Sequence, residues 1–244
     1  MKTFHRPVMV SEILNALNVK GGGSYIDSTV GEAGHSASIL DAVKPTPNLL
    51  GIDLDENALE TANQRLGKYG DKVKLVQGCY TDMVKYANMH GFEQVDGVLF
   101  DLGLSSLQLS SEIRGFGFSS TGNLDMRFDM DQGLTASHVV NQFDERTLAE
   151  IIYRFGEEPA ARRIARAIVA ARPIHSPASL AATASRAVGR GRKNRTHPAT
   201  RTFQAVRIAV NQELDRVKDG LADSLQVLKP TGRLVVLAYH SLED

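Results

Sequence analysis

Short apolar runs alternate with amphipathic segments over the first hundred residues of the chain. Each run is rich in β-branched residues and ends at turn-forming residues, which is typical of a strand buried in a sheet. Four runs predict strands, at Ser24–Val30, Asn48–Asp55, Lys72–Tyr80 and Val95–Gly103.

Helical patterns fill the gaps between these strands. They lie at Gly34–Ala42, Glu56–Tyr69 and Thr81–His90. Asp55 is placed to cap the second helix, because its carboxylate can accept hydrogen bonds from the free N–H groups of the first turn. Alternating strands and helices predict an α/β fold with a mostly parallel sheet, which binds ligands at the carboxyl ends of its strands.

A fifth strand follows only after a long interruption of this alternation. Arg233–His240 predicts that strand, and a Lys-Pro-Thr-Gly turn precedes it. An apolar stripe predicts one long helix over Ala199–Leu228. The interruption itself has helical patterns at Glu145–Phe155, Glu158–Ala171 and Pro177–Val188. We therefore predict a sheet domain made of residues 1–107 and 200–244, with an inserted helical subdomain at 108–199.

Acidic residues are absent from one long stretch of the chain. Between Glu158 and Glu213 lie 54 residues with 11 Lys and Arg and no Asp or Glu, whereas the whole chain has 28 basic and 28 acidic residues. Such segregation of charge favours a surface that binds nucleic acid over a merely solvated set of helices. The candidate nucleic-acid contacts lie in a glycine-broken segment that we predict to be a loop following phosphates, at Arg190, Arg192, Lys193 and Arg195.

The remaining composition excludes several classes of protein. A single cysteine, Cys79, rules out an internal disulfide and fits a reducing compartment. No apolar run approaches the ~18 residues that span a bilayer, and no secretion signal opens the chain. The seven histidines are scattered, without the close spacing of metal ligands. We expect a soluble cytoplasmic protein without a metal centre, and the sequence does not distinguish a monomer from a homodimer.

Glycines and polar residues follow the predicted strands at the edge where a ligand would bind. The turn from Gly31 to Gly34 follows the first strand, and Asp53, Tyr80 and Asp101 end the next three. Glycines let backbone N–H groups approach a ligand, a carboxylate can hold ribose hydroxyls, and an aromatic ring can pack on adenine. This order fits a nucleoside cofactor, and the short glycine spacing favours S-adenosylmethionine over NAD. The structural alternatives are a tight turn, a helix cap and a ring at the rim of the core.

Several longer motifs cover nearly the whole chain, at Gly31–Ser36, Asp101–Leu109, Arg114–Phe118, Leu124–Arg127, Tyr153–Glu158, His197–Ile208 and His240–Asp244. Together they resemble the motifs of one known family, the ribosomal RNA small subunit methyltransferase H family. The resemblance implies a Rossmann-like class I methyltransferase sheet, S-adenosylmethionine as methyl donor, and N4 of a cytidine in 16S rRNA, near the decoding centre of the small ribosomal subunit, as target. Family members continue for some tens of residues beyond the last motif.

The resemblance also implies which residues contact the cofactor. We expect Gly34 and His35 to offer donors to the methionine carboxylate, and Asp53 to hold the ribose. Tyr80 should flank adenine. The family has glycine where this chain has Ala33, so the added methyl group requires a negative φ there. The full implied set is Ala33, Gly34, His35, Asp53, Tyr80, Asp101 and Gln108.

Methyl transfer to a cytosine amine needs a group that holds a weak nucleophile and accepts its proton. Asp101 leaves an apolar strand at the ligand edge and is the first candidate, and His240 at the end of the fifth strand is the second. The alternative for His240 is a structural role. No aromatic residue follows Asp101, so Phe116 and Phe118 are candidate platforms for a flipped base, with a place in the core as the alternative.

Three other functions remain open at this point. A non-catalytic RNA-binding or assembly factor on a methyltransferase fold would bind RNA without transferring a methyl group. An NAD(P)-dependent oxidoreductase would bind nicotinamide, which the glycine pattern disfavours. A methyltransferase acting on DNA or on another RNA would differ only in its target. The family resemblance favours 16S rRNA within the assembled small ribosomal subunit.

Overall fold

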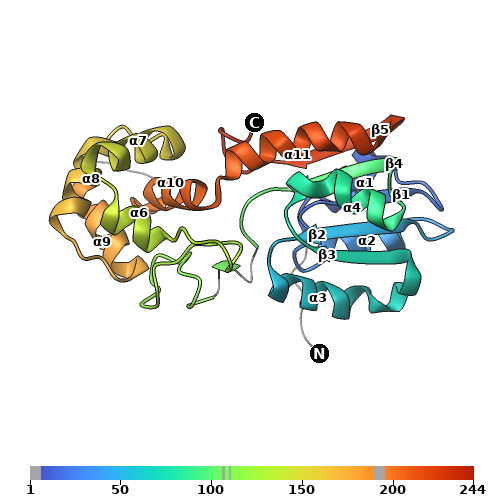
Figure 1. The fold of residues 1–244 in the computed structure, drawn as a ribbon, viewed down its shortest axis with the longest axis horizontal. Coiled ribbons are helices and arrows are strands. Elements are labelled where there is room, and N and C mark those ends of the chain that lie inside the picture. The colour runs from blue at the N-terminus through green and yellow to red at the C-terminus, as the bar shows by residue number, and fades with distance from the viewer. Residues whose placement is uncertain (1–6, 106–107, 110, 190–195) are drawn as a thin grey trace. The chain divides into compact units, whose positions relative to one another are not determined.

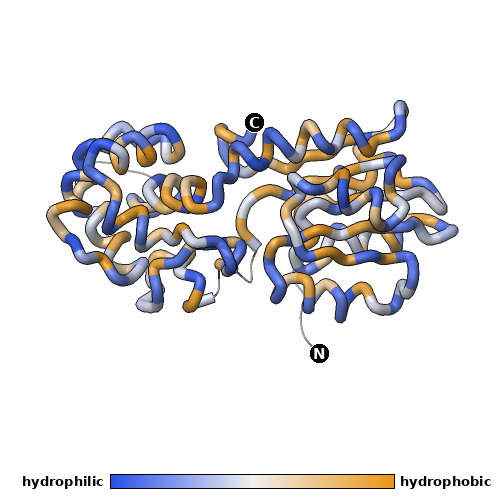
Figure 2. The backbone as a smooth tube through the Cα atoms, viewed as in Figure 1, coloured by the Kyte–Doolittle hydropathy of each residue, from blue (hydrophilic) through white to orange (hydrophobic). Residues whose placement is uncertain are grey.

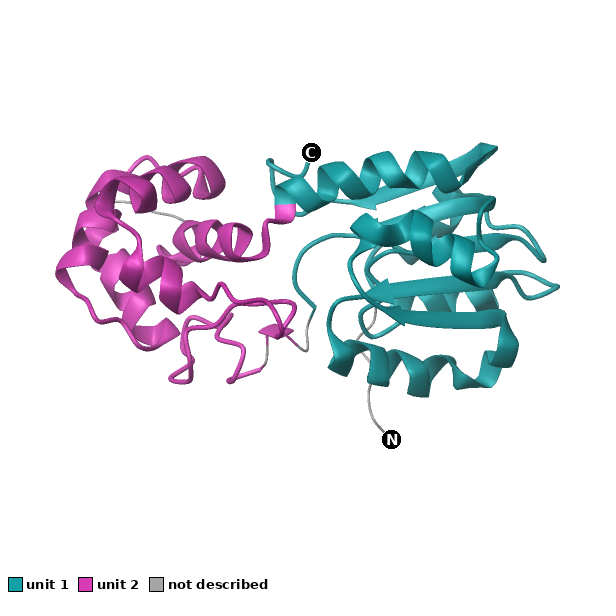
Figure 3. Cartoon of the chain, in the orientation of Figure 1, with its two compact units in different colours: residues 1–105, 214–244 teal, residues 106–213 magenta. Residues whose placement is uncertain are grey.

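The computed structural model divides the chain into two compact units. The first comprises Met1–Ser105 and Leu214–Asp244, and the second comprises Ser106–Glu213 (Figure 3). The structure describes residues 7–105, 108–109, 111–189 and 196–244. Among these residues, no helix combines the length and the apolar character needed to cross a membrane.

A five-stranded sheet forms the centre of the first unit (Figure 1). Its order is β3-β2-β1-β4-β5, and every neighbouring pair is parallel. The order reverses direction between β1 and β4, which is where sheets of this kind hold ligands. The strands are β1 (Ser24–Asp27), β2 (Asn48–Asp53), β3 (Val73–Gln77), β4 (Val95–Asp101) and β5 (Leu228–Leu237).

Helices bury both faces of this sheet. One core cluster joins the sheet to α1 (Val10–Leu17), α2 (Gly34–Asp41) and α3 (Glu56–Leu66). The other joins it to α4 (Met83–His90) and α11 (Glu213–Val227). The neighbouring residues Leu49 and Leu50 enter different clusters, because successive side chains of a strand point to opposite faces. This burial on both faces explains the continuous apolar runs along the strands (Figure 2).

The first unit also contains two short 3-10 helices, η1 (Gly67–Lys72) and η2 (Tyr80–Asp82). Asp55 caps α3, since its side chain accepts a hydrogen bond from the N–H of Asn57, as the sequence predicted. The helix predicted over Glu56–Tyr69 ends earlier, at Leu66, and the 3-10 helix η1 continues the chain toward β3.

The second unit is built from helices. Asp144 caps α7 and Ser176 closes a capping box on α9. Helix α7 packs closely on α10 at Gly156, where an added β-carbon would lie only 2.5 Å from the carbonyl oxygen of Arg201. Glycine allows this close approach. The helices are α6 (Ala136–Gln142), α7 (Glu145–Gly156), α8 (Ala161–Ala170), α9 (Pro177–Val188) and α10 (Thr200–Asn211).

The predicted single helix over Ala199–Leu228 is wrong. Gln212 adopts a left-handed conformation with φ of 50°, so the chain breaks there into α10 and α11. The boundary between the two units falls at the next residue, and α10 belongs to the second unit rather than to the predicted sheet domain at 200–244. The apolar stripe continued through Gln212 because both helices bury a face, although they bury it in different units.

The fifth strand also differs from its prediction. It begins at Leu228 and ends at Leu237, so the predicted Lys-Pro-Thr-Gly turn lies within it. A register shift between Val95 and Gly97 accommodates the irregular segment. The residues from Ala238 onward therefore form a turn beyond the sheet, and this places Tyr239 and His240 at its carboxyl edge.

Candidate active site

Three aspartates mark the carboxyl ends of β1, β2 and β4. Asp27 is buried and accepts a hydrogen bond of 2.6 Å from the Ser36 hydroxyl group. This bond joins the end of β1 to the first turn of α2. Burial raises the pKa of Asp27, and the Ser36 bond and nearby His35 partly oppose that rise. The aspartate thus holds the turn between the first strand and the first helix of the site.

Asp53 organises the glycine turn after β1. Its Oδ2 accepts a hydrogen bond of 2.8 Å from the N–H of Gly31, and its Oδ1 accepts one of 2.9 Å from the N–H of Asp55. Gly31 has φ of 48°, which glycine adopts without strain. Burial raises the pKa of Asp53 to about 6 against the opposing effect of these two N–H groups. The carboxyl group therefore changes protonation near neutral pH.

The expectation that Ala33 has a negative φ is wrong. Its φ is 58° and its ψ is 33°, a left-handed conformation at the N-cap of α2. The methyl group is fully buried in the core cluster of α1, α2 and α3. Burial of that methyl group offsets part of the strain, which for an L-residue amounts to roughly 1–2 kcal/mol.

His35 lies in the first turn of the same helix. Its side chain is 7% exposed, and Nε2 lies 3.4 Å from Asp101 Oδ2. Neither ring nitrogen makes a hydrogen bond among the described residues. A buried polar group without a hydrogen bond marks a place where a ligand can supply one.

Asp101 is held from two neighbouring strands. Its N–H donates to the Thr29 hydroxyl group at 2.7 Å, which fixes the end of β4 against the loop after β1. Its Oδ1 accepts a hydrogen bond of 2.8 Å from the hydroxyl group of Tyr239, beyond β5. The Asp101 side chain stays 27% exposed. Asp101 is a residue that the strand pattern predicted at this edge, whereas Tyr239 fell inside the predicted fifth strand and was not predicted as a site residue.

His240 is bound by its own turn. Its Nε2 lies 3.2 Å from Glu243 Oε1, and Glu243 Oε2 accepts a hydrogen bond of 2.9 Å from the N–H of Tyr239. The Glu243 carboxylate therefore closes the turn after β5 around both residues. This geometry favours the structural alternative for His240.

Tyr80 packs against the core of the first unit. Its ring meets Phe100 edge-on with centroids 5.3 Å apart. A side chain at Gly220 of α11 would meet the Tyr80 ring at 2.5 Å, so glycine is needed for this contact. The ring is partly exposed, and its role beside adenine stays a prediction.

The candidates in the second unit are mostly engaged in its core. Gln108 is buried. Phe116 is buried and packs on Phe128, which makes it a core residue rather than a base platform. Phe118 stacks on His197 with centroids 4.7 Å apart and meets Phe203 edge-on. These contacts hold the motif loop against α10.

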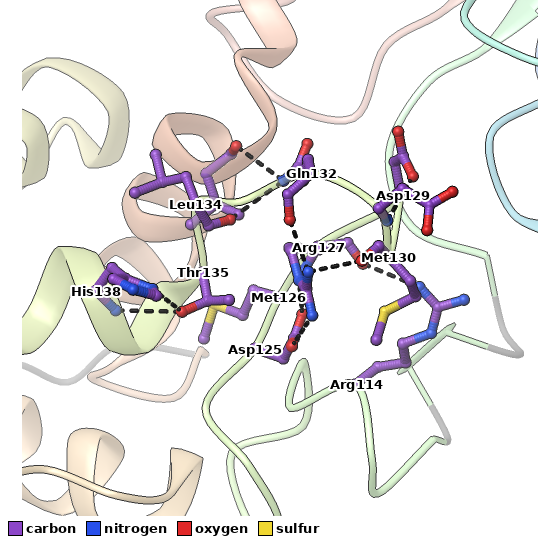
Figure 4. A network of polar contacts seen from close by, with 12 residues as sticks. Arg114, Asp125, Met126, Arg127, Asp129, Met130, Gln132, Leu134, Thr135 and His138 are labelled. Atoms are coloured by element: carbon purple, nitrogen blue, oxygen red, sulfur yellow. Dashed lines mark hydrogen bonds and ion pairs between the residues drawn. The ribbon is translucent and has the colours of Figure 1, made fainter.

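The loop from Leu124 to Thr135 is fixed by a dense polar network (Figure 4). The Arg127 side chain makes two hydrogen bonds to Asp125 and donates to the carbonyl oxygens of Met130 and Gln132. The Asn211 side chain donates to the carbonyl oxygen of Met126, whose φ of 61° is left-handed. The end of α10 thus holds a strained segment of this loop in place.

Comparison with known proteins identifies the family. The model of the MraW methylase family matches residues 2–244. A Thermomicrobium roseum protein named ribosomal RNA small subunit methyltransferase H is 47% identical, over 100% of this chain and 76% of the relative. Proteins of the same name from Dehalococcoides mccartyi and Syntrophus aciditrophicus are 47% and 46% identical, over 98% and 99% of this chain and 68% and 78% of their own length.

The chain belongs to the MraW methylase family. S-adenosylmethionine is the methyl donor of such a methylase. The sheet edge fits this molecule, because α2 begins without a side-chain cap and so presents free N–H groups to a carboxylate. His35 adds ring nitrogens without a hydrogen bond, and Asp53 adds a carboxylate for hydroxyl groups. The group would supply an electrophilic methyl carbon at this edge.

The predicted RNA contacts of the basic stretch stay a prediction. Arg190, Arg192, Lys193 and Arg195 lie outside the described residues. Elsewhere in the basic stretch, Arg163 donates to the carbonyl oxygen of Val188. No group of three or more potential metal ligands occurs in the described part of the chain.

Proposed function

We propose that this protein transfers a methyl group from S-adenosylmethionine to N4 of a cytidine in 16S rRNA, near the decoding centre of the small ribosomal subunit. The observation that carries the proposal is the partly exposed Asp101 carboxylate at the switch point of the sheet, held by Tyr239 and adjacent to His35. The relatives are named ribosomal RNA small subunit methyltransferase H, which supports the ribosomal RNA target. A ribosomal target also places the protein in the cytoplasm.

The residues at the sheet edge divide the work between cofactor and base. We assign the first turn of α2, including Ala33, Gly34 and His35, to the methionine end, and Asp53 to the ribose. Tyr80 lines the adenine side, and Gln108 of the second unit remains a proposed contact. This assignment follows the order in which ligands lie across sheets of this class, from the first strand outward.

Asp101 acts on the nucleophile. The exocyclic amine of cytosine is a weak nucleophile because its lone pair is delocalised into the ring. A hydrogen bond from the amine to Asp101 orients the lone pair toward the methyl carbon. Bound S-adenosylmethionine would supply the methyl group and retain the sulfur–carbon electron pair on its sulfur, and Asp101 would accept the proton that the amine releases. Orienting the reactants can supply ~7–11 kcal/mol of the barrier reduction in favourable cases.

His240 is the second catalytic candidate, and its contacts suggest a positioning role. Its Nε2 lies 3.2 Å from Glu243 Oε1, and Glu243 Oε2 accepts the N–H of Tyr239, so these contacts support the turn that carries Tyr239. The His240 side chain is 15% exposed, whereas that of Asp101 is 27% exposed and is the more accessible to a substrate.

The basic segment with Arg190, Arg192, Lys193 and Arg195 would supply the phosphate contacts. Reversing two charges, Arg192→Glu with Lys193→Glu, should abolish binding of small subunits and leave the S-adenosylmethionine affinity unchanged. A double reversal at the exposed Lys74 and Lys85 of the first unit is the matched control. Equal subunit affinity in the two double variants would remove the segment from the proposal.

Transfer of labelled methyl groups tests the function itself. Unmodified small ribosomal subunits are incubated with the protein and methyl-labelled S-adenosylmethionine, and the digested nucleosides are identified by mass spectrometry. Label in N4-methylcytidine is the expected result, with free 16S rRNA and duplex DNA as comparison substrates. Label in another nucleoside or on DNA would contradict the proposed target. Subunit binding without any label would favour the non-catalytic binding factor.

A further inference from the structure

Tyr239 is an exposed aromatic residue whose hydroxyl group is nevertheless hydrogen-bonded. Its side chain is 59% exposed. Its hydroxyl group donates to Asp101 Oδ1 at 2.8 Å, and its N–H donates to Glu243 Oε2 at 2.9 Å. The first bond ties the far end of the ring to the candidate carboxylate, and the second ties the backbone that carries the ring to its own turn.

The ring lies beside the Asp101-Leu102-Gly103 segment. A β-carbon added at Gly103 would lie 3.5 Å from the Tyr239 ring, and φ of 98° at Gly103 suits glycine alone. The Leu102 N–H donates to the carbonyl oxygen of Leu237 at 3.1 Å, which ties the ends of β4 and β5 together. The aromatic face and the candidate carboxylate are therefore fixed to each other by the sheet.

This arrangement supplies what the segment after β4 lacks. Leu102 is buried and Gly103 has no side chain, so neither can stack on a base. Phe116, one of the predicted platforms, is buried against Phe128 in the second unit. Tyr239 instead offers an exposed ring from the turn after the neighbouring strand β5, on the same edge as Asp101.

We propose that Tyr239 is the platform on which the target pyrimidine stacks, and that its hydroxyl group positions Asp101 to accept the exocyclic amine. The inference rests on the proposed methylation of a nucleobase. Stacking of a base on an aromatic side chain changes affinity by about tenfold or more. Burial raises the pKa of Tyr239, and the bond to Asp101 raises it further, so the hydroxyl group remains a donor at working pH.

Two substitutions separate the two roles. Tyr239→Leu removes the ring and should raise the KM for small subunits about tenfold and lower kcat. Tyr239→Phe keeps the ring and should leave that KM within about twofold, while kcat falls because Asp101 loses the hydrogen bond that orients it. Tyr239→Trp should restore the KM that Tyr239→Leu loses.

Controls separate these effects from damage to the fold. Thermal unfolding and S-adenosylmethionine affinity should be unchanged in all three variants. Tyr69→Phe removes a hydroxyl group that bonds to the carbonyl oxygen of Ala37, away from the site, and should leave kcat and KM unchanged. An unaltered KM in Tyr239→Leu, or identical kcat and KM in Tyr239→Leu and Tyr239→Phe, would overturn the inference. If the wild-type protein methylates no nucleobase, the proposed function has failed, and the inference falls with it.

Discussion

The carboxylates of the sheet edge and the arginines of the helical unit differ in the groups to which they are hydrogen-bonded. Asp27, Asp53 and Asp101 accept hydrogen bonds from hydroxyl and N–H groups of neighbouring loops. Arg163 of α8, by contrast, donates to the carbonyl oxygen of Val188 at the end of α9, and Arg201 of α10 donates to that of Glu157 at the end of α7. The first group shapes an edge that can receive a ligand, whereas these arginines close helix ends.

The contrast limits what charge counts can predict. Within the basic stretch, Arg172 donates to the carbonyl oxygens of Val140 and Phe143, and Arg207 forms two bonds to Glu213. An arginine that satisfies buried carbonyl groups contributes to the net charge of a surface but is not free to follow a phosphate backbone. The count of 11 basic residues therefore overstates the number available to RNA.

The largest expected effect falls on the sheet edge, at Asp101. Asp101→Asn keeps an oxygen that can accept the Tyr239 hydroxyl group but cannot take up the amine proton, so kcat should fall about 10²–10⁴-fold. S-adenosylmethionine affinity should remain within about threefold. Single-turnover transfer with small subunits and calorimetric titration measure the two quantities.

Asp96 is the matched control for Asp101. It lies near the start of β4, where its carboxylate binds Lys229 at 2.8 Å and the N–H of Ser24 at 3.0 Å. Asp96→Asn should lower the free energy of unfolding and leave kcat unchanged. If both variants lost activity alike, the contrast between ligand-facing and structural carboxylates would be wrong.

The next effect falls on the helical unit and concerns stability. Arg207 and Glu213 are 12% and 8% exposed and form a two-bond ion pair. Arg207→Met should lower the free energy of unfolding by about 3–5 kcal/mol, because the buried carboxylate loses its charged partner. Adding Glu213→Leu should restore most of the loss. Chemical denaturation measures both variants.

An exposed arginine of the same unit sharpens that result. Arg162→Met on α8 should change the free energy of unfolding by no more than about 0.5 kcal/mol. A similar loss in Arg162→Met and Arg207→Met would show that the arginines do not differ as their contacts indicate.

The sequence predicted the edge of the sheet better than the helical unit, for a physical reason. In a parallel sheet the carboxyl ends of all strands lie at the same edge, so Asp53 and Asp101 could be placed there from the strand pattern alone. The break at Gln212 could not, because helical spacing continued on both sides of it. Tyr239 was missed since β5 ends at Leu237, and apolar spacing does not show where pairing stops.

The contact partners of individual side chains also could not be predicted from the sequence. The pattern placed His240 at the edge but not against Glu243, and it placed Phe116 in a motif but not in the core. The φ of Ala33 was predicted with the wrong sign, because sequence reasoning assumed that an alanine excludes a left-handed conformation. Burial in a cluster of apolar side chains overrides that local preference.

A smaller effect follows from the protonation of Asp53. The proposed ribose contact requires the ionised carboxylate, so with a pKa of about 6 the S-adenosylmethionine affinity at pH 5 should be about tenfold lower than at pH 7. The contribution of Asp53 to folding stability changes with pH in the opposite direction. The folded pKa exceeds the unfolded value of about 3.9, so the stabilising contribution is complete below pH 4 and is lost as pH rises to 6.

Titration calorimetry between pH 5 and pH 7 measures the affinity. Asp53→Asn should flatten the profile, whereas Asp41→Asn, at an exposed carboxylate paired with Lys68, should retain it. A flat profile in the wild-type protein would mean that Asp53 does not contact the cofactor in its ionised form.

The smallest effect tests the strain at the N-terminus of α2. Ala33→Gly relieves a left-handed alanine, worth roughly 1–2 kcal/mol, and loses a buried methyl group, worth about 0.8 kcal/mol. The difference predicts a gain in unfolding free energy of about 0.5 kcal/mol. Ala37→Gly, within the same helix, relieves no strain and should lose about 0.5–1 kcal/mol. Opposite signs in the two variants, measured by thermal unfolding, would establish that the turn before α2 stores strain beside the proposed methionine site, and a loss in both would show that burial of the methyl group outweighs it.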